Sequence, residues 1–168
     1  VFIRGLLDRS SVLAARKRII RKLRTLGRIQ ESSDPTEAVC EGKHGVFLFN
    51  HEDIRSAPEV KAVLESTRLF QLFEGLFGEA ASTYTYKWLR AVGMEEYTGA
   101  HLDTVYMGRG SPDLHTAWIP FGDIPVEQGT LMIYPGSHRR PEFEGIRSQS
   151  SHYWASASLC ILYRDSLA

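Results

Sequence analysis

The N-terminal part of the chain repeats apolar residues at the spacing of an α-helix. The pattern predicts a helix that begins after a cap at Asp8 or Ser10, runs to about Leu26 and stops at Gly27. Residues 1–4 precede it and have the apolar character of a short buried strand. The apolar stripe of the helix consists of Val12, Ala15, Ile19, Leu23 and Leu26.

A second helical pattern follows a polar loop, a short apolar run over residues 45–49 and a connector over residues 50–57. Pro58 suits the first position of a helix, and we expect Ser56 to cap it. The helical spacing continues to Phe77 and ends at Gly78. We expect its aromatic residues to be core anchors: Phe70, Phe73 and Phe77.

The period changes after Ala81 to one typical of β-strands. Short segments rich in β-branched and aromatic residues alternate with turns, and Pro135 begins the last of these turns. The order of the elements, with helices first and strands afterwards, predicts an α+β fold. We expect a β-sandwich or barrel with helices packed against one sheet. The expected strands cover residues 82–92, 99–108, 114–121 and 129–134.

Composition narrows the class of protein. With 168 residues and no formal net charge, the chain suits one domain over 1–168 and gives no bulk attraction to nucleic acid or membranes. Many of the residues at positions 16–24 are basic. This basic stretch could bind phosphates, but a solvated helix face explains it better. The two cysteines lack C-x-x-C spacing, and neither a signal peptide nor a membrane-spanning run is visible. We therefore expect a cytoplasmic protein whose natural N-terminus is missing.

His101 and Asp103 carry the candidate chemistry. Side chains alternate along a strand, so these two residues would share one face, about 7 Å apart at the backbone. Alone, a His-x-Asp pair is a weak signal. Placed on a strand of a small barrel with room for a third ligand, it matches the 2-His-1-carboxylate arrangement of non-haem Fe(II) oxygenases.

Four motifs in fixed order make the sequence resemble the phytanoyl-CoA dioxygenase family of Fe(II)- and 2-oxoglutarate-dependent oxygenases. The family pattern is His-x-Asp, Trp-Ile-Pro-x-x-Asp, Glu-x-Gly-x-Leu and Pro-Gly-Ser-His, and the likeness spans about residues 1–147. The matching residues are His101 and Asp103, Trp118 to Pro120 with Asp123, Glu127 to Leu131, and Pro135 to His138.

The resemblance implies a double-stranded β-helix (jelly-roll) core with helices packed outside. It implies Fe(II) held by His101 and Asp103, 2-oxoglutarate as cosubstrate and ascorbate as an optional reductant. Trp118 and Thr83 are implied as lining the cosubstrate pocket, although core packing explains Trp118 equally well. The implied reaction hydroxylates a small organic substrate while 2-oxoglutarate is oxidatively decarboxylated to succinate. Neither the substrate nor the oligomeric state can be read from the sequence.

The C-terminal tail departs from the family pattern. A third ligand, a distal histidine after a Gly-Asp turn, and an arginine for the far carboxylate of 2-oxoglutarate are expected well after the Pro-Gly-Ser-His turn. His152 and Arg164 have a tolerable spacing, but the atypical tail 148–168 lacks that turn and strand. We therefore expect a chain that is cut or diverted after about Arg147. The alternative function is a catalytically incomplete jelly-roll module that binds without turning over.

Overall fold

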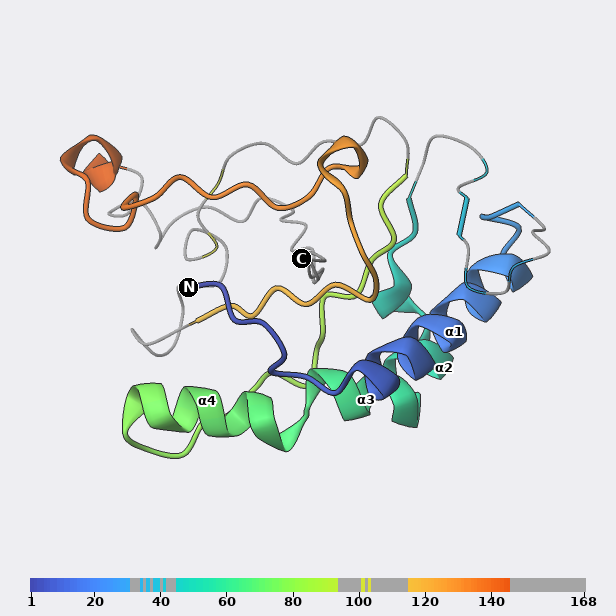
Figure 1. The fold of residues 1–168 in the computed structure, drawn as a ribbon, viewed down its shortest axis with the longest axis horizontal. Helices are drawn as coiled ribbons and strands as arrows, with labels where there is room; N and C mark the ends of the chain where they lie inside the picture. The colour runs from blue at the N-terminus through green and yellow to red at the C-terminus, as the bar shows by residue number, and fades with distance from the viewer. Residues whose placement is uncertain are drawn as a thin grey trace.

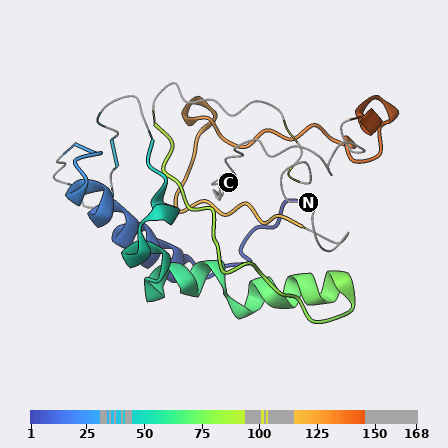
Figure 2. The ribbon, with the colours of Figure 1, turned by 180° about the vertical axis from the view of Figure 1, so that it is seen from behind.

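The computed structural model describes residues 1–30, 34, 36, 38–39, 41, 45–93, 101, 103 and 115–145. Within these residues, the helices gather on one side of the molecule, and the elongated segments of the later half lie on the other side (Figure 1). The reverse view shows the same two-sided arrangement (Figure 2). The principal helices are α1 (Arg9–Thr25), α2 (Glu52–Arg55), α3 (Pro58–Leu64) and α4 (Thr67–Phe77).

Helix α1 confirms the first predicted helix. Asp8 is its N-cap, and the carboxylate accepts a hydrogen bond from the Ser11 amide at 2.8 Å. Gly27 adopts a φ of 62°, which a side chain would disfavour, and follows the C-cap. The helix buries a stripe that packs against α2 and α3. Its buried residues are Ala15, Ile19, Ile20 and Leu23.

Replacing Asp8 with asparagine should weaken the acid sensitivity of the fold while keeping the cap. Hydrogen bonds from Ser10 and then Ser11 lower the pKa of Asp8 to about 2 from an ordinary value of 3.8. The stability that the ionised cap contributes is therefore fully present above pH 3.8 and is lost as the pH falls through about 2. We expect Asp8→Asn, which also caps well, to flatten that loss in urea titrations across this range.

The corresponding control is Asp8→Ala, which should be less stable than Asp8→Asn at every pH because the cap acceptor is gone. Equal acid sensitivity in the parent and Asp8→Asn would contradict the assignment of the low pKa to this cap.

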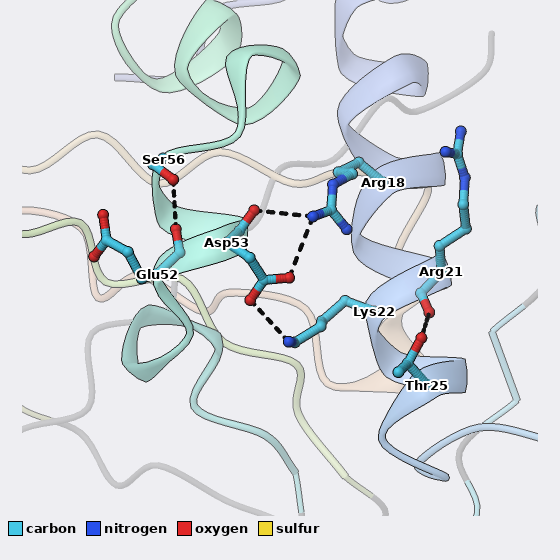
Figure 3. Close-up of polar contacts among 7 residues, drawn as sticks. All are labelled: Arg18, Arg21, Lys22, Thr25, Glu52, Asp53 and Ser56. Atoms are coloured by element: carbon cyan, nitrogen blue, oxygen red, sulfur yellow. Dashed lines mark hydrogen bonds and ion pairs between the residues drawn. The ribbon is translucent and has the colours of Figure 1, made fainter.

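Three short helices correct the prediction for residues 50–77. The expected connector contains α2, and Ser56 ends α2 by donating to the Glu52 carbonyl at 2.6 Å instead of capping α3 (Figure 3). Pro58 does begin α3, after Ala57. The expected continuous pattern breaks before α4, because Ser66 turns out of the helix and accepts from the Leu69 amide at 3.3 Å.

Helix α4 ends at Gly78 as predicted, with a φ of 73°. The expected core anchors are only partly confirmed. Phe73 packs against the core, and Phe77 stacks on Phe73 with 5.8 Å between ring centroids. The buried side chain of this helix is Leu69 instead.

Gly75→Ala should stabilise the fold by about 0.5–1 kcal/mol, because alanine restricts the unfolded chain and favours helix. Gly75 lies inside α4, and a Cβ there would meet nothing within 4 Å. Gly78→Ala is the matched control and should destabilise, since its φ of 73° suits glycine. Chemical denaturation of both variants tests this, and a destabilised Gly75→Ala would contradict the open environment.

Helix α2 is attached to α1 by polar contacts as well as by packing. The Asp53 carboxylate accepts hydrogen bonds from Arg18 Nη2 at 3.2 Å and from Lys22 Nζ at 2.8 Å (Figure 3). Arg18 Nη2 also donates to the Asp53 backbone carbonyl at 3.0 Å. The hydrogen bond from Lys22 is the largest influence lowering the pKa of Asp53. Arg18 and Lys22 are thus half-buried and engaged within the fold, which the solvated-face interpretation of residues 16–24 did not predict.

The core joins the helices to two later segments. Ile20, Ile54 and Val60 are almost completely buried between α1, α2 and α3. Leu89 and Ile119 reach the same cluster from the segments that follow the helices. The helical side of the fold therefore holds the chain on both sides of the His101 region in place.

No strand is assigned among the described residues, so the strands expected over residues 1–4, 82–92, 114–121 and 129–134 are not found there. Val1 and Phe2 are exposed rather than buried. An isolated antiparallel bridge joins Val46 to Ala91. A β-prone sequence becomes a strand only with a hydrogen-bonded neighbour, and the expected neighbour, 99–108, lies almost wholly outside the described residues. The turn at Pro135 is confirmed by a hydrogen bond that the Ser137 amide donates to the Tyr134 carbonyl at 3.2 Å.

Candidate functional site

His101 and Asp103 are brought together. The distance from His101 Nε2 to Asp103 Oδ1 is 3.4 Å, and the two side chains are 28% and 29% exposed. A metal bound by two adjacent ligand atoms at about 2.1 Å each holds those atoms about 3 Å apart. The nitrogen and oxygen of this pair therefore fit two neighbouring ligand positions of an Fe(II) ion with little movement.

The candidate for a third ligand lies outside the described part of the chain. Within the residues that the structure describes, no group of three or more His, Cys, Asp or Glu side chains gathers at one point. His152 and Arg164, the candidates for the distal ligand and the 2-oxoglutarate arginine, fall in a segment that is not described.

The segment that carries Trp118 is attached to the helical core. Ile119 and Phe121 belong to the buried cluster, Ala117 packs against it, and Pro120 between them is also buried. Trp118 is half-buried. Its role as a pocket wall and its role in core packing both stay predictions.

Arg16 ties this segment to α1. Its Nη1 donates to the Phe121 carbonyl at 3.1 Å, while Nε and Nη2 donate to the Thr36 carbonyl at 3.2 and 3.0 Å. Gly122 lies directly under the guanidinium, where an added Cβ would collide with it. Arg16 and Gly122 together fix the end of the Trp118 segment against α1.

Gly122→Ala should destabilise the fold by about 1 kcal/mol, because the guanidinium must leave the Phe121 carbonyl. Gly145→Ala is the control, since a Cβ at Gly145 meets nothing within 4 Å. Denaturation curves for the two variants measure the difference. If Gly122→Ala matches both the control and the parent, Arg16 is not required at the Phe121 carbonyl.

Thr83 and Lys87 form a local group beside the α3–α4 junction. Lys87 Nζ lies 3.3 Å from Glu65 Oε1 and 3.3 Å from Thr83 Oγ1, and it also contacts the Tyr84 carbonyl. Thr83 is exposed. The Lys87 amine is therefore directed at Glu65.

The other histidines have structural settings. The His115 ring lies edge-on to Phe73 and Phe77, with centroid distances of 6.2 and 5.1 Å. His138 follows the Pro135 turn and is exposed.

Sequence reasoning missed a group of aromatic residues around Arg90. Phe49 contacts Tyr86 and Trp88 at centroid distances of 5.0 and 5.2 Å, and the Arg90 guanidinium lies 5.7 Å from the Phe47 ring. The alternation of aromatic residues with Leu48 and Leu89 was the available signal.

Comparison with known proteins gives one match. A family model described as phytanoyl-CoA dioxygenase (PhyH) matches residues 1–161. No curated protein and no solved structure matches the chain. Among the described helices, none is long and apolar enough to cross a membrane.

Proposed function

Because the chain belongs to the phytanoyl-CoA dioxygenase family, we propose that it is an Fe(II)- and 2-oxoglutarate-dependent dioxygenase that hydroxylates a small organic substrate. The observation that carries this proposal is the convergence of His101 Nε2 and Asp103 Oδ1 to 3.4 Å within the matched residues. An imidazole nitrogen and a carboxylate oxygen side by side are two of the three ligands of a facial triad.

His101 would hold the ion through Nε2, and Asp103 would offset part of its charge through a carboxylate oxygen. When bound, Fe(II) supplies the activation of dioxygen that couples decarboxylation of 2-oxoglutarate to substrate hydroxylation. Both side chains are more than two-thirds covered, so the protein limits the access of bulk water to the pair.

We propose a jelly-roll core built on the helical layer described above, within a single domain over 1–168. The segment that carries Trp118 supports this arrangement. Ile119 and Phe121 attach it to the helices, and the half-buried Trp118 is the residue of this segment that would face the interior of a barrel.

Trp118 is proposed as a wall of the 2-oxoglutarate pocket on the resemblance and on its half-buried side chain. Thr83 is proposed on the resemblance alone. Its hydroxyl accepts from Lys87, so cosubstrate binding through Thr83 would require that bond to rearrange.

The test is an anaerobic titration of the purified chain with Fe(II) and 2-oxoglutarate, followed by admission of oxygen. We expect a weak metal-to-ligand charge-transfer band in the visible and then formation of succinate. His152→Ala should abolish the band if His152 is the third ligand. A parent chain that binds neither Fe(II) nor 2-oxoglutarate would replace this proposal with the alternative, a jelly-roll module that binds a small molecule without turnover.

A further inference from the structure

A short antiparallel pairing sets two segments in register at the edge of the helical layer. Val46 and Ala91 exchange both backbone hydrogen bonds, at 2.8 and 2.9 Å, and the Phe49 amide donates to the Leu89 carbonyl at 3.0 Å. Beside this bridge the Phe47 ring lies next to the Arg90 guanidinium, and the Phe49 ring lies next to Trp88.

Aromatic residues gather beside this bridge. Leu48 and Leu89 are buried in the core, at 1% and 3% exposure. Four aromatic residues around them form what we call the aromatic face: Phe47, Phe49, Tyr86 and Trp88, of which Trp88 also packs against the core. The Phe49 ring centroid lies 5.4 Å from that of Phe47, 5.0 Å from that of Tyr86 and 5.2 Å from that of Trp88. The centroids of Tyr86 and Trp88 lie 5.6 Å apart.

The aromatic face is open to an incoming molecule. Phe47 remains 46% exposed and Tyr86 remains 40% exposed, although each is held in edge-on or tilted contact with Phe49. Exposed aromatic surface that is already ordered loses little side-chain entropy when a ligand covers it. Four rings held at these distances therefore form a ready surface for an apolar or aromatic body.

Arg90 lies at one end of this face and is 9% exposed. Its guanidinium lies 5.7 Å from the Phe47 ring centroid. An aromatic ring offers a guanidinium charge attraction without a hydrogen-bond acceptor. The N–H fork of arginine matches a carboxylate in a bidentate pair.

We propose that the aromatic face and Arg90 bind a monocarboxylic acid with an aromatic or apolar body. The carboxylate pairs with Arg90, and the body lies across Phe47 and Trp88. The site is defined by binding alone, so it stands whether or not the chain turns over 2-oxoglutarate. Tyr86 adds a hydroxyl beside it, and burial raises the pKa of that phenol, which keeps the proton available for donation at neutral pH.

The test measures tryptophan fluorescence of the whole chain during titration with phenylacetate, with octanoate as the aliphatic acid and phenylacetamide as the uncharged analogue. We expect saturable quenching by phenylacetate that is lost in Trp88→Phe. Arg90→Gln and the exchange of phenylacetate for its amide should each weaken binding about tenfold or more, the effect of losing hydrogen bonds to a charged group. Arg21→Gln is the matched control, since Arg21 is an exposed arginine on α1 that is not part of the aromatic face.

Phe47→Leu provides a second variant whose folding is not in question, because Phe47 is half exposed. It should weaken phenylacetate binding several-fold while the thermal midpoint stays near that of the parent. The proposal is overturned if a folded Arg90→Gln or Phe47→Leu binds as the parent does. It is equally overturned if neither acid gives saturable quenching up to about 10 mM, a range in which even a millimolar complex registers.

Discussion

His101→Ala and Asp103→Ala should each weaken Fe(II) binding by at least about 100-fold and abolish 2-oxoglutarate turnover, because even outer-shell partners of a metal site change affinity by 10–100-fold. The two ligand atoms lie 3.4 Å apart, so removing one leaves a single protein donor from this pair. Asp103→Ala also removes the negative charge that offsets the cation. Anaerobic metal titration and succinate formation measure the two effects separately.

His138→Ala is the control for this pair. His138 is an exposed histidine on the Pro135 turn, so its loss removes the same chemical group without touching the proposed ligands. We expect metal affinity to be unchanged in that variant. Fe(II) binding that survives in both His101→Ala and Asp103→Ala would place the metal elsewhere and would remove the basis of the proposed reaction.

The helices could be predicted because their signals are local. Asp8, Gly27 and Gly78 each act on the turn next to them, through a cap acceptor or a positive φ, and each lies where the sequence placed it. The break before α4 was missed because the periodic apolar pattern continues across it. Only the Ser66 hydroxyl, which accepts from the Leu69 amide, shows that a new helix begins there.

Non-local pairing explains what the sequence could not predict on the β-prone side. The register between Val46 and Ala91 joins residues 45 positions apart (91 − 46), and nothing in either segment specifies the other. The aromatic face follows from that register, so it became visible only in the structure. The His101–Asp103 pair was accessible to sequence reasoning because its members are two residues apart, whereas a third ligand must come from a distant segment.

Helix α2 was missed for a related reason, and it leads to the second large prediction. A helix of four residues is not stable by itself, so α2 depends on its contacts with α1 and α3. Ile54 is completely buried at 0% exposure, while Asp53 is exposed at 49% of its side chain. Packing of Ile54 should therefore hold α2 in place far more than the ion pairs of Asp53 do.

Ile54→Ala should destabilise the fold by about 2–5 kcal/mol, since it removes buried methylene groups and leaves a cavity between three helices. Ile54→Val keeps most of the volume and should lose only about 0.5–1.5 kcal/mol. Asp53→Asn removes the charge that meets Arg18 and Lys22 and should shift the urea midpoint much less than Ile54→Ala, because those contacts are exposed to solvent. Urea denaturation of the three variants ranks the effects. An Asp53→Asn variant as unstable as Ile54→Ala would mean that the polar contacts, and not the buried isoleucine, fix α2 against α1.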